Sequence, residues 1–185
     1  NPPYDVGTAG QMEFVEHALN VLDKEKNGRV VAIVQMSCAT KNEADLFAVK
    51  ERLLAKHHLK AVISMPDDLF YPVGVVTCIM VFEANKPNKG RKTWFGYFKD
   101  DGFEKRKYIG RIDAKDRYTD LKKRLLSAYF NLEEIPGFSV KHEVCASDEW
   151  CAEAYMETDY STLLASDFDK KIREYCAFKL LTNLK

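Results

Sequence analysis

Residues 28–66 hold the pattern that decides the fold of this chain: GRVVAIVQMSCATKNEADLFAVKERLLAKHHLKAVISMP. The β-branched run at residues 28–36 lacks polar alternation, which predicts a strand buried on both faces, as in parallel sheets. Residues 40–43 have the spacing of a helix capping box. A helix after them is predicted by a stripe of apolar residues, Leu46, Val49, Leu53 and Leu54. Residues 59–66 form the next predicted strand, which Pro66 stops.

The elements on either side of this stretch extend the alternation of strands and helices. Before it, apolar residues recur every three or four positions at residues 11–22, which predicts a helix. After it, a strand at residues 74–84 follows the strand at 59–66 too closely for a crossover helix, so the two should be antiparallel. An aromatic-rich strand is expected at residues 93–103. The order predicts an α/β fold, a partial doubly wound sheet with an antiparallel strand pair.

The last part of the chain has mostly helical signals. Apolar residues at helical spacing predict helices at residues 118–132, 147–156 and 166–181. We therefore expect two domains, residues 1–103 with the sheet and residues 104–185 as a mostly helical extension.

The composition describes an electrically neutral chain, with 28 Lys and Arg against 28 Asp and Glu in 185 residues. It lacks the basic excess of proteins that bind nucleic acid by themselves, so another subunit would have to provide most of the contacts to a nucleic-acid partner. The five cysteines are odd in number and not paired in spacing, which predicts a reducing, cytoplasmic location rather than a disulfide framework. The apolar runs are too short to span a bilayer, so we expect no membrane association.

The tetrapeptide Asn1-Pro2-Pro3-Tyr4 is the strongest candidate for a functional site. Its prolines fix an extended backbone whose carbonyl oxygens stay free. At the carboxyl end of a sheet strand, where such folds bind ligands, it would receive a flat ring with an exocyclic amine. The Asn1 Oδ1 atom and the Pro2 carbonyl oxygen can accept the two amine hydrogens while Tyr4 stacks on the ring. Held in this way, the nitrogen lone pair is drawn out of conjugation and becomes a usable nucleophile.

Other candidate sites are weaker. His142, Cys145 and Cys151 lie close together in the sequence but lack the paired ligand spacing of structural zinc sites, so we expect no metal. Cys38 follows a predicted strand, yet no partnered His and acid indicate a nucleophile. The sequence also contains no glycine-rich phosphate loop.

The tetrapeptide and the segments after it resemble a known family. NPPY is followed by QMEFVEHALNVL, GRVVAIVQMSCAT and LKAVISMPDDLFYPVGVVTCIMVFEANKP. In order and spacing these resemble the methylation subunit of type I restriction-modification systems, which belongs to the N6-adenine DNA methyltransferases. The resemblance covers Asn1 to about Phe103, and implies that residues 1–103 are the C-terminal half of a catalytic domain.

The resemblance implies methyl transfer from S-adenosylmethionine to an adenine flipped out of DNA. It assigns the catalytic tetrad to Asn1, Pro2, Pro3 and Tyr4, and a second wall of the base pocket to Phe70. The implied partners are DNA and the specificity and restriction subunits of the same system. The specificity subunit would read the DNA sequence, and the helical tail would help to hold it.

One departure from the family changes the expectation for this chain alone. Family members carry a glycine-containing loop and an acid for the ribose ahead of the tetrapeptide, and this sequence has neither. We therefore expect a fragment that lacks the cofactor-binding half and is inactive by itself. Half of a doubly wound sheet also leaves one strand edge unpaired, which favours self-association.

Two alternatives to a DNA adenine methyltransferase remain open at this point. The chain could be a non-catalytic module that binds a specificity subunit. It could also be a methyltransferase that acts on another planar nitrogen, such as an RNA guanine or a protein glutamine, although the long aromatic and helical tail disfavours this.

Overall fold

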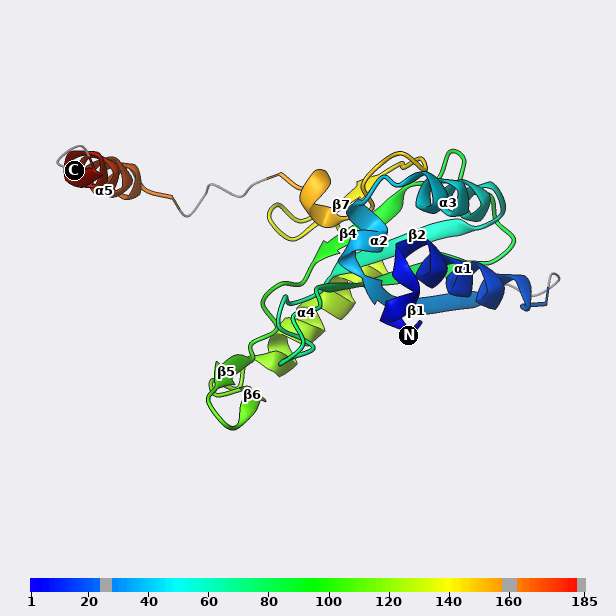
Figure 1. Ribbon diagram of the computed structural model, residues 1–185, viewed down its shortest axis with the longest axis horizontal. Coiled ribbons are helices and arrows are strands. Elements are labelled where there is room, and N and C mark those ends of the chain that lie inside the picture. The colour runs from blue at the N-terminus through cyan, green and yellow to red at the C-terminus, as the bar shows by residue number, and fades with distance from the viewer. Residues whose placement is uncertain (24–27, 158–162, 183–185) are drawn as a thin grey trace.

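A five-stranded mixed sheet is the centre of the fold (Figure 1), in the order β1-β3-β2-β4-β7. The computed structural model describes residues 1–23, 28–157 and 163–182. The strands of this sheet are β1 (Arg29–Gln35), β2 (His58–Ser64), β3 (Thr77–Glu83), β4 (Thr93–Tyr97) and β7 (Ser139–His142). A separate hairpin is formed by β5 (Glu104–Arg106) and β6 (Gly110–Ile112).

Helices cover both faces of the sheet. The α-helices are α1 (Gly7–Asn20), α2 (Met36–Thr40), α3 (Ala44–Lys56), α4 (Tyr118–Asn131) and α5 (Ala165–Thr182), and the short 3-10 helices are η1 (Tyr4–Val6) and η2 (Ala152–Ala154). One apolar core joins α1, α2 and α3 to one face of the sheet, around Met12, Leu46 and Phe82. A second core joins α4 to the other face, around Trp94 and Leu125. The predicted α/β class is therefore confirmed.

Strand directions place the ends of three strands at one edge of the sheet. β2 pairs with β3 in antiparallel register, as predicted, and β1 pairs with β3 in the same way. β2 and β4 are parallel. β1, β2 and β4 consequently run in the same direction and end at the same edge, which is where ligands bind in open α/β sheets.

Two details of the expected strand–helix–strand unit are wrong. β1 is an edge strand paired antiparallel to β3, and its burial alternates, with Val31 64% exposed and Ala32 buried. A β-branched run fits either environment, so composition alone could not distinguish them. The expected capping box does not form, because the Thr40 hydroxyl donates to the Met36 carbonyl oxygen at the end of α2. Glu43, which precedes α3, instead accepts a hydrogen bond from Thr8.

The expected helix at residues 147–156 is also wrong, because only η2 forms there. Trp150 is fully buried in this segment, with its Nε1 donating to the Cys145 carbonyl oxygen at 2.9 Å and its ring edge-on to Phe82. The need to bury this indole in the core overrides local helix propensity. The helices expected at residues 118–132 and 166–181 are confirmed as α4 and α5.

Residues beyond position 103 take part in the main sheet as well as in helices. β7 pairs with β4, and Val144 and Trp150 belong to the core beneath α1 and α3. α5 lies apart from the sheet in Figure 1, and all of its described side chains are exposed. The division of the chain at residue 103 stays a prediction.

Candidate active site at the carboxyl edge of the sheet

The tetrapeptide lies at the start of a rigid entry into α1. Pro3 has φ −64° and ψ 135°, the extended geometry that its ring favours, and η1 follows directly. Gly7, the first residue of α1, adopts φ +73° and ψ −179°, a combination that is essentially restricted to glycine. Pro3 therefore restrains the backbone before Tyr4, and Gly7 permits the change of direction after it.

A buried glutamine joins the first turns of α1 to the end of β1. The Gln11 Nε2 atom donates to Gln35 Oε1 at 2.8 Å, and the Gln35 backbone N–H donates to Gln11 Oε1 at 3.0 Å. Gln11 Nε2 also donates to the Gly7 carbonyl oxygen. Because Gln35 is the last residue of β1, these bonds hold the beginning of α1 at the carboxyl edge of the sheet.

Tyr4 and Phe70 meet at this edge. Their ring centroids are 6.1 Å apart with an interplanar angle of 89°, an edge-to-face contact. Phe70 comes from the loop that joins β2 to β3, far from Tyr4 in the sequence. The structure thus brings together two of the five residues expected to form the site.

The Tyr4 hydroxyl is directed into an apolar, thiol-lined environment. Its oxygen is buried and makes no hydrogen bond to any described residue. Burial raises the pKa of Tyr4, and the nearby Cys78 and Cys38 thiols raise it further by smaller amounts. Burial also raises the pKa of Cys38 to about 12. Tyr4 is therefore neutral at physiological pH and offers its ring rather than a proton, and Cys38 is not an activated nucleophile.

Asn1, Pro2 and Pro3 line a hollow of about 270 Å³. Its other walls come from α1 and from residues 30–32 of β1. Asn1 and Pro3 are exposed and Pro2 is buried. The structure places these three residues against β1, while Tyr4 turns toward Phe70, and their roles stay predictions.

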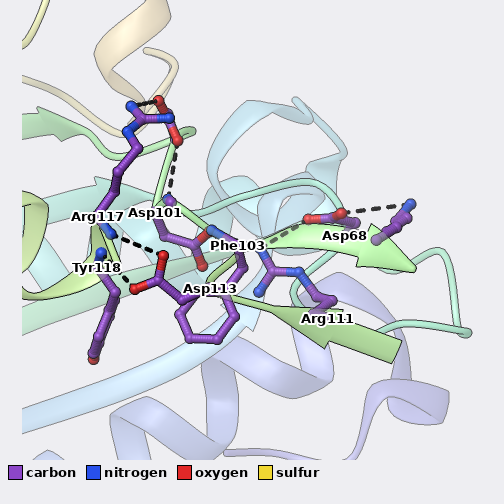
Figure 2. A network of polar contacts seen from close by, with 10 residues as sticks. Asp68, Asp101, Phe103, Arg111, Asp113, Arg117 and Tyr118 are labelled. Carbon is purple, nitrogen blue, oxygen red and sulfur yellow. Dashed lines mark hydrogen bonds and ion pairs between the residues drawn. The ribbon is translucent and has the colours of Figure 1, made fainter. Parts of the chain in front are cut away.

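A charged network that the sequence did not predict supports the Phe70 loop (Figure 2). Arg111 Nη2 lies 3.1 Å from Asp68 Oδ1 and 2.7 Å from Asp101 Oδ1, and its guanidinium covers the Phe103 ring. On the same loop, Asp67 accepts a hydrogen bond from Lys99 at 2.7 Å. The run of basic residues after residue 104 could have indicated this network, but the net charge of the whole chain, which is zero, gave no sign of it.

The Cys and His residues considered for a metal site have separate partners. His142 stacks on Tyr155 with centroids 4.2 Å apart, and the Cys145 thiol lies 3.0 Å from the Ser147 hydroxyl. Within residues 1–23, 28–157 and 163–182, no three His, Cys, Asp or Glu side chains are grouped so that they could hold a metal ion. No helix in the same ranges is long and apolar enough to cross a membrane.

Comparison with known proteins identifies the family. The family described as N-6 DNA Methylase matches residues 5–179. The chain belongs to this family. The resemblance seen in the sequence is therefore confirmed, although the matched range begins just after the tetrapeptide. The chain is 32% identical over 189 residues to the type II restriction enzyme and methyltransferase RM.BcgI of Heyndrickxia coagulans. That alignment covers 97% of this chain and 29% of the relative, so the chain spans less than a third of that relative's length.

Solved structures of restriction-modification proteins share the fold of the methylase chain. The type I methyltransferase subunit of Streptococcus thermophilus matches with a TM-score of 0.57 and 19% identity, over 71% of this chain and 26% of that one. A modification subunit of a putative type I restriction enzyme from Vibrio vulnificus matches with a TM-score of 0.57 and 17% identity, over 76% and 29%. A chain from a study of the assembly of the type I R-M system matches with a TM-score of 0.58 and 19% identity, over 95% and 40%.

The described residues do not form a site for S-adenosylmethionine, the cofactor that the family implies. Such a site needs a glycine-rich turn from a strand into a helix and an acid for the ribose. β1 instead runs directly into α2 at Met36, and the loop after β2 carries Phe70 and the ion pairs of Asp67 and Asp68.

Proposed function

We propose that this chain forms the base-holding part of a DNA methyltransferase that modifies adenine at N6 in a restriction-modification system. S-adenosylmethionine is the methyl donor in this proposal. The observation that carries it is the contact between Tyr4 and Phe70 at the carboxyl edge of the sheet, directly after a rigid Asn-Pro-Pro segment. The family match favours DNA adenine over RNA guanine or protein glutamine as the target.

The chemistry of the proposal belongs to five residues. Asn1 Oδ1 and the Pro2 carbonyl oxygen accept the two hydrogens of the adenine amino group. Pro2 and Pro3 keep the backbone extended, so that these oxygens need no rearrangement when the base arrives. Tyr4 stacks on the flipped base, and Phe70 forms a second wall of the pocket. With both hydrogens accepted, the amino nitrogen becomes more nucleophilic.

The partners proposed are DNA and the specificity and restriction subunits of a type I system. The exposed helix α5 supports a role for the tail in holding the specificity subunit, because Phe168, Ile172 and Tyr175 lie on one side of it and are all more than half exposed. The unpaired edge of β1 supports self-association of the chain when it is alone. The five free cysteines support a cytoplasmic location.

Replacing Asn1 with Ala in the intact protein that contains this chain tests the function. Loss of one hydrogen-bond acceptor that acts in the transition state should lower methyl transfer to an adenine-containing duplex by about 100-fold or more. Binding of S-adenosylmethionine, measured by calorimetry, should not change. Equal loss of transfer and cofactor binding would contradict the role of Asn1. A wild-type assembly that labels no adenine would overturn the function, and would leave the non-catalytic module as the better reading.

A further inference from the structure

The segment from the β5–β6 hairpin through the first turns of α4 is strongly basic. Residues 104–124 contain nine Lys and Arg but four Asp and Glu, in a chain where the two classes are equal in number. The positive charge is therefore gathered in one stretch, although the whole chain is neutral. Local charge of this kind, rather than the net charge, is what a polyanion meets at close range.

The tip of the hairpin is exposed and has few contacts. Tyr108 is 93% exposed and Ile109 is 69% exposed, although both are large apolar side chains. Tyr108 also has φ +67°, an uncommon backbone conformation for an aromatic residue. Lys107 lies over the Tyr108 ring at 4.9 Å and has no carboxylate partner in the described part of the chain. Neither packing nor charge pairing among the described residues accounts for these side chains.

The base of the hairpin is fixed to the loop that carries Phe70. Arg111 on β6 pairs with Asp68 (Figure 2). Lys105 on β5 lies 3.6 Å from the same carboxylate. The Lys105 Nζ atom also covers the Tyr71 ring at 5.5 Å. Asp68 and Tyr71 flank Phe70 in the sequence, so the hairpin stands directly beside the proposed base pocket.

We propose that the β5–β6 hairpin binds duplex DNA next to the flipped adenine, through contacts of Lys105, Arg106 and Lys107 with backbone phosphates. A two-stranded ribbon is narrow enough to enter the major groove, which would place Tyr108 and Ile109 inside it. Phosphate contacts of this kind set the position of the protein on the duplex without reading its sequence. This inference rests on the proposed function, because it takes DNA as the substrate.

The test removes three hairpin charges and leaves the Arg111 part of the anchor in place. The variant Lys105→Gln/Arg106→Gln/Lys107→Gln keeps Arg111 and its two ion pairs. The matched control is Lys89→Gln/Arg91→Gln/Lys92→Gln, which removes three equally exposed charges from the loop between β3 and β4, at the opposite edge of the sheet. Both variants are made in the intact methylase that contains this chain, and circular dichroism melting checks that they are folded.

Binding to a fluorescent duplex is measured by anisotropy between 50 and 200 mM salt. Each phosphate contact contributes about 0.9 to the slope of log affinity against log salt. We expect the hairpin variant to bind the duplex more weakly than the parent, with a slope smaller in magnitude by about two to three. The control variant should have the affinity and slope of the parent. Unchanged slope and affinity in a folded hairpin variant would overturn the proposal. A hairpin variant that binds DNA normally but loses a protein subunit in gel filtration would also overturn the proposal.

Methyl transfer by the parent protein is measured separately. A parent that binds the duplex but labels no adenine would overturn the proposed function, while the salt slopes still decide whether the hairpin contacts DNA. A parent that binds no duplex at all would overturn the hairpin proposal.

Discussion

Lys50 is a buried cation whose surroundings make stability depend on pH. Its side chain is 1% exposed, and its Nζ atom donates to the Ala39 carbonyl oxygen at 3.0 Å and, more weakly, to that of Asp148. The ammonium group also lies 4.7 Å from the centre of the Trp150 ring. Burial lowers the pKa of Lys50 from 10.5 to about 8. The charge therefore links α3 to the end of α2 and to the segment before Trp150, at a cost in desolvation.

The lowered pKa predicts that the contribution of Lys50 to stability rises with pH above about 8. Between pH 8 and 10.5 the unfolded chain holds the Lys50 proton and the folded protein releases it, so the unfolded state binds more protons. The contribution should be about 1 kcal/mol for each pH unit in this window. Urea unfolding of the wild type and of Lys50→Met at pH 7 to 10 measures it as a difference, which cancels titration of the cysteines. A difference that stays constant over that range would contradict the prediction.

Elements with strong local signals could be predicted from the sequence, and those that depend on distant partners could not. α3 has an apolar stripe that only a helix can bury on one side. The connection predicted at residues 67–73 is too short for a crossover helix, which indicated the antiparallel pairing of β2 and β3 that the structure has. β7 was missed because Ser139–His142 is short and forms a strand only by pairing with β4. In the site, the two prolines of Asn-Pro-Pro-Tyr predicted a rigid backbone, and Tyr4 predicted an aromatic ring that can stack on a base. The support that Arg111 and Asp68 give to the Phe70 loop depends on a tertiary contact across more than forty positions.

The exposed apolar side of α5 can be tested as a surface that binds another subunit. Ile172 is 60% exposed on the apolar side of this helix, so Ile172→Asp should change the free energy of unfolding by less than about 0.5 kcal/mol. If the helix holds the specificity subunit, the same change should weaken that association by about 30-fold, as expected for an interface anchor. Calorimetric titration of the two subunits measures it. Ser166→Asp puts the same charge on the opposite side of the helix, beside Asp169 and Lys170, and should bind normally. Equal effects of both variants would show that the apolar side is not the interface.

Helices cover the two faces of the sheet to different extents. α1, α2 and α3 cover one face completely enough that Ala32 and Val34 of β1 are buried. On the other face α4 packs around Trp94 and Phe98, and Val31 of β1 is left 64% exposed. β1 also pairs with a strand on one side only within the described sheet. An open backbone edge and an exposed apolar side chain therefore occur on the same strand.

This asymmetry predicts that the chain alone associates with itself through β1. Backbone N–H and C=O groups on a free edge can extend the sheet into a second copy, and a lysine on such a strand opposes this pairing because the charge would have to be buried or brought close to its equivalent. Sedimentation of the chain alone should show a concentration-dependent dimer, and Val31→Lys should shift it toward the monomer. Val21→Lys is the matched control, because Val21 is 67% exposed and follows the end of α1 rather than lying on β1. Equal sedimentation of the two variants would exclude β1 as the contact, because both carry the same new charge at similar exposure and only one carries it on the open strand.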